Sequence, residues 1–256
     1  MNGLLRVGNI LFAIAIAFFG LQFVIFAASL TGPLPGPPWT HGSVLVAWLI
    51  AAGFLIAALS IAVGTMARWA LLLLGAAILL FGILHYLPIL VARPHDPGPW
   101  TVLFELLALG GGALVAAANF PAPPAGGFVF TLGHAGRFLI AISLVVFAVQ
   151  HFMYARFVAM LVPAWIPAHL FWAYFTGIAF VAAALAIVAN KIVRLAAVLL
   201  GTMFLLWVVL LHVPRVAGAT RNGNEVTSLF VAVAMCGLSF VLAGTYGNRL
   251  EGHGAY

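Results

Sequence analysis

Eight apolar stretches, each about as long as a membrane-spanning helix, dominate this sequence. A helix needs about 20 residues to cross a hydrocarbon core of about 30 Å. By hydropathy, the stretches lie at residues 9–30, 43–63, 69–91, 100–119, 137–159, 169–189, 193–213 and 226–246. They are apolar on every side and about twice as long as the strands of a membrane β-barrel. The sequence therefore predicts an all-α, polytopic membrane bundle of eight helices.

Charged residues are too few to cover a globule that faces water. Only 5% of the 256 residues are Asp, Glu, Lys or Arg, whereas soluble domains contain about 25%. The single cysteine, Cys236, excludes an intrachain disulfide and a CxxC redox pair. The basic residues are scattered singly, which is not the pattern of a nucleic-acid-binding surface. The lipid bilayer is the partner that this composition predicts.

Two halves of the sequence resemble each other. FGLQFVIFA (19–27) aligns with FAVQHFMYA (147–155) at an offset of 128 residues, which places Gln22 on Gln150. After a two-residue change in length, an Arg, a Gly and a Pro recur at an offset of 126: Arg68 with Arg194, Gly75 with Gly201, and Pro88 with Pro214. We predict four-helix repeats at 1–122 and 135–256, joined by a linker at 123–134. Because each repeat has an even number of helices, the two should run in parallel across the membrane.

The basic residues predict the orientation of the chain. Six lie on the side of the termini: Arg6, Arg68, Arg137, Lys191, Arg194 and Arg249. Four lie on the opposite side: Arg93, Arg156, Arg215 and Arg221. Cytoplasmic loops carry the excess of Lys and Arg. We therefore expect both termini in the cytoplasm and the chain in the inner (plasma) membrane of a bacterium.

Polar residues gather on the side opposite the termini. Six of the eight histidines lie there: His41, His85, His95, His151, His169 and His212. The second repeat has the richer set of candidate binding residues: Gln150, His151, Tyr154, Arg156, His169, His212 and Arg215. The first repeat has Phe23, Phe26 and Ala28 in place of His151, Tyr154 and Arg156. Ionisable groups within spans are costly to keep, so we predict a site in the second repeat and a degenerate one in the first. The alternative is that these amphipathic rings only anchor the helices at the interface.

Two further features lie within the fourth stretch. Glu105 is an intramembrane carboxylate, which indicates either a functional site or a structural pair with His41, His85 or Arg93. GGGALVA (110–116) has no preceding strand, so it is not a dinucleotide-binding fingerprint. It is instead typical of close helix packing through small residues.

The second repeat resembles the DoxX-like family of small four-helix membrane proteins. The resemblance rests on AVQHFMYA (148–155), VPAWIP (162–167) and YFTGIAF (174–180). It implies a four-helix unit associated with quinone-linked oxidases or redox-stress systems. Family members frequently have an acidic residue near the start of the second helix, where this chain has Trp172, Ala173 and Tyr174. That departure argues against proton or metal chemistry that needs a carboxylate there.

The leading functional hypothesis is a DoxX-like subunit that binds a quinone or a similar amphiphile at the outer face. His151, Tyr154 and His169 would donate hydrogen bonds to a quinone carbonyl, and Arg156 or Arg215 would stabilise the reduced anion. Electrons would come from a protein partner, because no redox cofactor motif is present. One alternative is a non-enzymatic assembly or cargo-binding membrane protein. Another is a metal-handling transporter, although the outward arginines oppose a bound cation and no metal or haem is predicted.

Overall fold

The computed structural model describes residues 3–27, 44–120, 127–218 and 223–252. Within these ranges the chain is helical, with short turns and no strand. Eight of the described helical stretches are long and apolar enough to cross a membrane. The prediction of an all-α polytopic membrane bundle is therefore confirmed.

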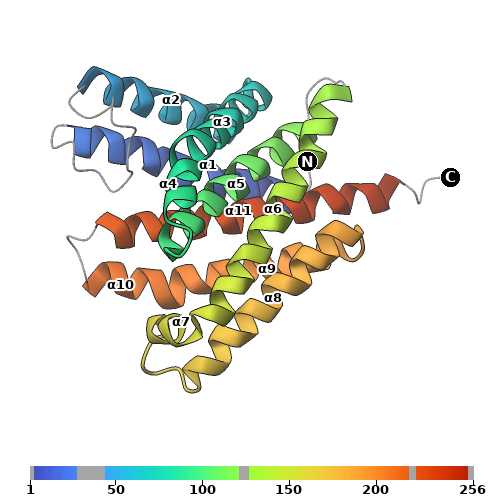
Figure 1. The fold of residues 1–256 in the computed structure, drawn as a ribbon. Helices are drawn as coiled ribbons and strands as arrows, with labels where there is room; N and C mark the ends of the chain where they lie inside the picture. The colour runs from blue at the N-terminus through green and yellow to red at the C-terminus, as the bar shows by residue number, and fades with distance from the viewer. Residues whose placement is uncertain (1–2, 28–43, 121–126, 219–222, 253–256) are drawn as a thin grey trace.

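Two of the eight spans are composite, and the others are continuous α-helices. The first half contains α1 (Gly3–Ala27), α2 (Val44–Val63), α3 (Ala67–Phe81), the π-helical segment η2 (Gly82–Tyr86), α4 (Leu87–Ala92) and α5 (Pro97–Asn119). The second half contains α6 (Gly127–Met153), α7 (Ala155–Leu161), α8 (His169–Ala189), α9 (Val193–Trp207), the π-helical segment η3 (Val208–His212), α10 (Val213–Gly218) and α11 (Gly223–Gly252). The start of α1 and the end of α11 lie at the same end of the bundle (Figure 1).

The fifth span begins earlier than the sequence predicted. The predicted stretch starts at residue 137 and follows a linker at 123–134, but α6 begins at Gly127. Residues 127–134 of that linker are therefore helical. Pro124 is the last proline of the PAPP sequence, and α6 begins three residues later. Proline lacks the backbone N–H that a helix needs, and no residue of α6 is a proline. The proline cluster, and not the charge at Arg137, marks the boundary.

A proline lies inside both the third and the seventh helical spans. The sequence analysis already carried the third stretch past Pro88 to residue 91, but it ended the seventh at residue 213, just before Pro214. The helices continue past Pro88 to Ala92 and past Pro214 to Gly218. Proline lacks an N–H and its ring clashes with the carbonyl four residues earlier. The turn before each proline is widened, so that Leu87 N–H donates to Gly82 O and Val213 N–H donates to Val208 O. A π-helical turn thus keeps each span continuous.

These two composite spans have the same local structure. The helices α3, η2 and α4 begin at residues 67, 82 and 87, and α9, η3 and α10 begin at 193, 208 and 213. Every start is 126 residues apart, the offset at which the sequence aligns. Each span is also entered through a left-handed residue, Met66 with φ 54° and Ile192 with φ 47°.

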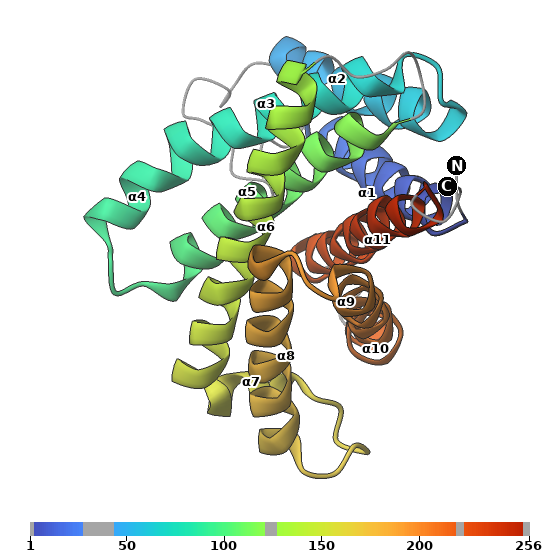
Figure 2. The ribbon, with the colours of Figure 1, turned by 90° about the vertical axis from the view of Figure 1, so that its right-hand side faces the viewer.

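The eight spans form a closed ring. Contacts follow the order α2, α1, α11, α9, α8, α6, α5, α3 and back to α2, and α5 also packs against α11 across the ring. Figure 2 shows this order in a view along several of the helices. The first helix of each predicted repeat therefore packs on the last helix of the other, α1 on α11 and α6 on α5.

Glycines allow these two crossings to be close. A Cβ on Gly8 would lie 2.5 Å from Gly237 O, and a Cβ on Gly111 would lie 2.7 Å from Gly136 O. The adjacent Gly112 faces Leu238 of α11. The prediction that the GGG sequence of α5 packs closely against other helices is confirmed. Small residues let helix backbones approach in a membrane, where lipid gives little drive for association.

The outer surface of the bundle is apolar. Large side chains such as Ile56, Leu73 and Leu199 are at least 60% exposed. In water such a surface would drive aggregation, but in a bilayer it faces acyl chains. The buried core lies along the ring and includes Phe12, Leu144 and Phe180.

Candidate functional site

His151 lies near the end of α6, where it contacts two aromatic rings. Its imidazole is parallel to the Trp207 ring of α9, with a centroid separation of 6.0 Å and an interplanar angle of 12°. It meets the edge of Phe180 of α8 at 5.2 Å. Nδ1 lies 2.8 Å from Phe147 O. Since a carbonyl only accepts, Nδ1 carries the proton and Nε2 of the neutral ring is an acceptor.

The Nε2 atom of His151 has no hydrogen-bond partner among the described residues. The ring is held on three sides, by Trp207, Phe180 and Phe147 O, so this nitrogen has a fixed direction. A hydroxyl is a neutral donor that such an acceptor can bind. The sequence analysis expected His151 to donate to a carbonyl, and the neutral ring is arranged to accept instead.

His212 lies five residues beyond Trp207, at the end of the π-helical turn η3. His212 makes no ring contact with Trp207 among the described residues, and the two residues share the span formed by α9, η3 and α10. Nδ1 of His212 is buried without a hydrogen-bond partner in the described part of the chain. Buried polar atoms are nearly always satisfied, so an unpaired one indicates a missing water or ligand. We call His151, Phe180, Trp207 and His212 the imidazole cluster.

Arg215 and Glu225 form an ion pair beside this cluster. Nε of Arg215 donates to Glu225 Oε2 at 2.8 Å, and Nη2 donates to Oε1 at 2.5 Å. The pair ties α10 to the first turn of α11, and both charges act on His212. The sequence analysis assigned Arg215 the role of stabilising a reduced anion. Its charge is instead matched by Glu225.

The other predicted site residues lie apart from the imidazole cluster. Gln150 faces α5, where Nε2 donates to Thr101 Oγ1 at 3.0 Å and to Pro97 O at 3.1 Å. Tyr154 occupies the break between α6 and α7, and Arg156 is exposed on α7. His169 begins α8, eleven residues before Phe180, which is about 16 Å along the helix. Within the described residues, no hydrogen bond or ring contact joins their side chains to the imidazole cluster.

Glu105 lies in α5, close enough to Tyr86 of η2 for an electrostatic interaction. It forms no ion pair within the described part of the chain. Of the three partners predicted for it, His41 lies outside the described residues. His85 stacks on Phe81 at 5.3 Å instead. Tyr86 was not considered from sequence, because the π-helical turn that places it could not be read there.

Trp207 and Phe180 are site residues that sequence reasoning missed. Both lie within uniformly apolar runs, where one more aromatic residue gives no contrast. The alignment of the two halves of the sequence could have identified Phe180. Phe23, which aligns with His151, stacks on Phe54 at 6.1 Å, and His151 contacts the edge of Phe180. Phe54 and Phe180 are 126 residues apart. The corresponding positions in the first half of the chain thus have an aromatic contact without the imidazole.

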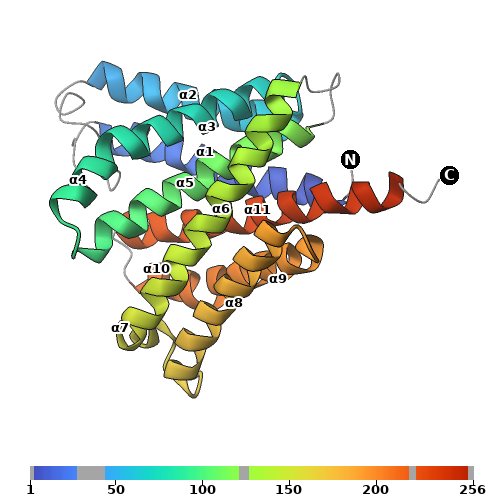
Figure 3. The ribbon, with the colours of Figure 1, turned by 45° about the vertical axis from the view of Figure 1, so that its right-hand side comes forward.

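The spans that carry the cluster, α6, α8 and α9, lie together in Figure 3. Among the described residues, no group of three or more His, Cys, Asp or Glu side chains is arranged to hold a metal ion. Two imidazoles are available for a ligand, His151 on α6 and His212 on the span formed by α9, η3 and α10.

Part of the chain matches the model of a protein family. Residues 140–244 match the model of a family described as a Domain of unknown function (DUF8561). The matched region begins within α6 and ends within α11, so it includes the whole imidazole cluster. No curated protein and no solved structure matches the chain.

Proposed function

We propose that this membrane protein binds a quinone, or a similar planar amphiphile with hydroxyl or carbonyl groups, at the imidazole cluster of its second repeat. Two ring nitrogens carry the proposal: Nδ1 of His212, which is buried without a partner in the described part of the chain, and Nε2 of His151, which is left as an acceptor when Nδ1 donates to Phe147 O. In the reduced quinol, a hydroxyl donates to Nε2 of His151. The proton can pass to that nitrogen when the quinol is oxidised, which is general-base chemistry suited to imidazole.

The aromatic surroundings of the cluster suit a flat, apolar ligand. Trp207 and Phe180 meet edge to face at 5.9 Å, so the imidazole of His151 lies against two ring surfaces. Ligand sites are lined mainly by apolar and aromatic groups with a few polar groups that fix orientation. Trp207 is only half-buried, so the cluster reaches the surface of the bundle, from which a lipid-soluble ligand arrives.

We propose further that the chain is a tandem pair of parallel four-helix repeats of the DoxX-like type. The constant offset of 126 residues between the composite spans, and the matched crossings of α1 with α11 and α6 with α5, support this. The chain itself supplies the ligand site, and a redox partner protein takes the electrons. Both termini lie in the cytoplasm of a bacterial inner membrane, as the basic residues favour.

Binding of decylubiquinone and its reduced form to the purified protein in detergent tests the first proposal. Quinones quench tryptophan fluorescence at short range, so binding beside Trp207 lowers the emission. We expect saturable quenching in the wild type. His151→Phe keeps a ring against Trp207 but removes the acceptor, and should raise Kd for the quinol about tenfold, because one lost hydrogen bond of this kind costs about 1.4 kcal/mol.

His85→Phe is the matched control. His85 lies in the π-helical turn of the first repeat and stacks on Phe81. Its replacement should leave Kd unchanged, and Trp207→Phe should abolish most of the quenching. Equal binding by wild type and His151→Phe would remove the basis of the proposal. One metal ion per chain, lost in His151→Ala, would favour the metal-handling hypothesis.

A further inference from the structure

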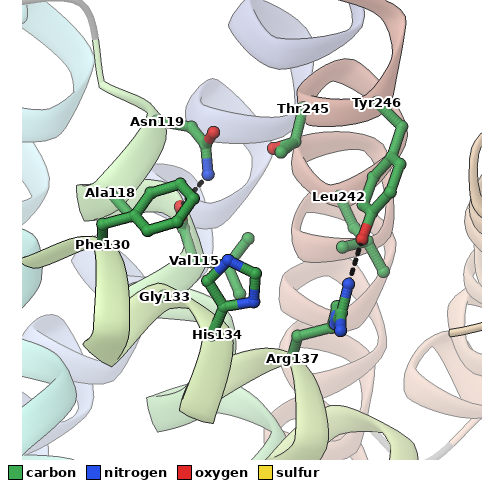
Figure 4. Close-up of a pocket in the computed structure, with 10 residues that line it drawn as sticks. All are labelled: Val115, Ala118, Asn119, Phe130, Gly133, His134, Arg137, Leu242, Thr245 and Tyr246. Atoms are coloured by element: carbon green, nitrogen blue, oxygen red, sulfur yellow. Dashed lines mark hydrogen bonds between the residues drawn. The ribbon is translucent and has the colours of Figure 1, made fainter. Parts of the chain in front are cut away.

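A polar pocket lies at the end of the bundle away from the imidazole cluster, where α5, α6 and α11 meet. It is lined by apolar residues, by Phe130, and by five polar side chains: Asn119, His134, Arg137, Thr245 and Tyr246 (Figure 4). None of the lining residues is acidic. These residues come from the end of α5, the first part of α6 and the last part of α11. The pocket is therefore at the end of the bundle where the described chain begins and ends.

Arg137 is the charged group of this pocket. Its Nη1 donates both to Asn190 Oδ1 at 2.7 Å and to Tyr246 Oη at 2.5 Å. The Tyr246 hydroxyl in turn donates to Asn190 Oδ1 at 2.6 Å. Both acceptors are neutral, and Arg137 forms no ion pair with any residue that the structure describes. A guanidinium stays charged in proteins, so a full positive charge lies here without a carboxylate.

One edge of the Arg137 guanidinium remains available. Both hydrogen bonds use Nη1, whereas Nε is buried and has no hydrogen-bond partner in the described structure. Nε and Nη2 form the edge with which arginine binds carboxylate or phosphate through two parallel hydrogen bonds. A buried donor without a partner is rare and indicates an oxygen acceptor that the protein does not supply.

The surroundings favour an anion over a neutral ligand. The same end of the bundle carries Arg68, Lys191 and Arg194 close to the turns between spans. Basic pockets between membrane helices bind the phosphates of anionic lipid headgroups. The cavity measures about 30 Å³, which is enough for little more than an ordered water. A phosphate group is larger than this cavity, so it would have to bind across the mouth of the pocket and not inside it.

We propose that this pocket binds a phosphate group, which an anionic lipid headgroup and free phosphate have in common, through the unused edge of Arg137. The position of the pocket at the end of the spans matches the depth at which lipid phosphates lie. His134 and Asn119 line the same pocket and supply further polar atoms around the bound group. This site is separate from the imidazole cluster, and it does not depend on the function proposed there.

Thermal unfolding of the purified protein in detergent tests the site. Phosphatidylglycerol, phosphatidylcholine and inorganic phosphate are added separately at matched ionic strength. A ligand that binds only the folded state raises Tm. We expect phosphatidylglycerol to raise Tm by about 3 °C or more and phosphatidylcholine to raise it less. An equal rise with inorganic phosphate would identify the free ion as sufficient, and a rise with phosphatidylglycerol alone would identify the lipid.

Arg137→Gln should abolish the shift, and Arg194→Gln should retain it. Arg194 is exposed at the start of α9 on the same side, so both variants lose one positive charge. If Arg137→Gln does not fold, Thr245→Leu serves instead, because it fills the pocket and keeps Arg137. The Thr245 hydroxyl bonds to Val241 O of its own helix, so its loss costs little. A full shift in Arg137→Gln or Thr245→Leu, an equal loss in Arg194→Gln, or no shift in the wild type would overturn the proposal.

Discussion

The side-chain amide of Gln22 donates a hydrogen bond of 2.8 Å to the hydroxyl of Thr227, and so joins the first and last spans of the chain. Gln22 is almost fully buried, at 3% exposure. Thr227 in turn donates to Gly223 O at 2.9 Å within its own helix. Because that carbonyl takes the hydroxyl proton, the amide nitrogen of Gln22 must be the donor in the contact between helices.

The same contact occurs at the other crossing of the ring. Gln150 Nε2 donates to Thr101 Oγ1 at 3.0 Å, and Thr101 donates to Pro97 O at 3.0 Å. Gln150 follows Gln22 by 128 residues, and Thr227 follows Thr101 by 126, the two offsets at which the sequence aligns. Each glutamine therefore reaches the threonine of the other repeat. These exchanged polar contacts join the two proposed repeats.

Double-mutant cycles should detect both contacts. For Gln22→Leu with Thr227→Val, and for Gln150→Leu with Thr101→Val, we expect coupling energies of about 0.5–1.5 kcal/mol, the usual range for one hydrogen bond in protein or membrane. Reversible unfolding in mixed micelles gives the four free energies of each cycle. Thr202→Val is the control partner, since the Thr202 hydroxyl bonds to Val198 O of its own helix. Zero coupling in both glutamine cycles would show that the contacts are incidental.

Closely packed glycines should be intolerant of even one methyl group. In Gly111→Ala the new Cβ would lie 2.7 Å from Gly136 O and 2.8 Å from Leu139 Cβ, so α5 and α6 must separate. We expect a loss of about 1–3 kcal/mol, the usual cost of overpacking. Gly237→Ala should behave alike at the crossing of α11 with α1. Tm of each variant in detergent measures the effect.

Gly53→Ala is the control for these variants, because nothing lies within 4 Å of a Cβ at that position in α2. It should leave Tm unchanged or raise it slightly, since alanine is the better helix former. Similar losses in Gly53→Ala and Gly111→Ala would mean that glycine flexibility, and not close packing, explains the effect.

The sequence allowed the helices and the equivalence of Gln22 with Gln150 to be predicted, because apolar length and residue order carry that information. It did not reveal that each glutamine bonds to the opposite repeat, since this depends on how helices distant in sequence pack. Gln150 and His151 were grouped in one predicted site. They are about 100° apart on the helix, so Gln150 faces α5 while His151 faces α8 and α9.

The π-helical turns were also beyond prediction from a single sequence. Pro88 and Pro214 each favour the end of a helix in isolation. Within a membrane bundle, a break in a helix would leave backbone N–H and C=O groups without hydrogen bonds, which is costly. Widening one turn before the proline satisfies these groups at a lower cost in free energy. As a result, the seventh span continues through α10 beyond His212, and the π-helical turns determine which side chains lie near Glu105 and in the imidazole cluster.

The ion pair between Arg215 and Glu225 should depend on both partners. The pair is partly exposed, with side-chain exposures of 35% and 18%, so its contribution is modest. We expect Arg215→Gln and Glu225→Gln each to lower stability by about 1 kcal/mol, and the double variant to lose less than the sum. The exchanged pair, Arg215→Glu with Glu225→Arg, should recover part of the loss. It should not recover all of it, because an acidic residue in the first turn of α11 also favours the helix dipole.

Unfolding in detergent measures these free energies. Strictly additive effects of Arg215→Gln and Glu225→Gln would show that the two charges act independently. The same variants should also change quinone binding less than His151→Phe, because the ion pair lies beside the imidazole cluster and does not provide its unsatisfied nitrogens.

Both ends of the chain should lie in the cytoplasm. An even number of spans places the start of α1 and the end of α11 at one end of the bundle (Figure 3), and that end carries the larger number of basic residues. A reporter fused after Tyr256 should be active only as a cytoplasmic enzyme. A reporter inserted after Arg93, in the turn between α4 and α5, should be active only outside. The reversed pattern would contradict the orientation, and two reporters on the same side would contradict the alternation of spans that the parallel repeats require.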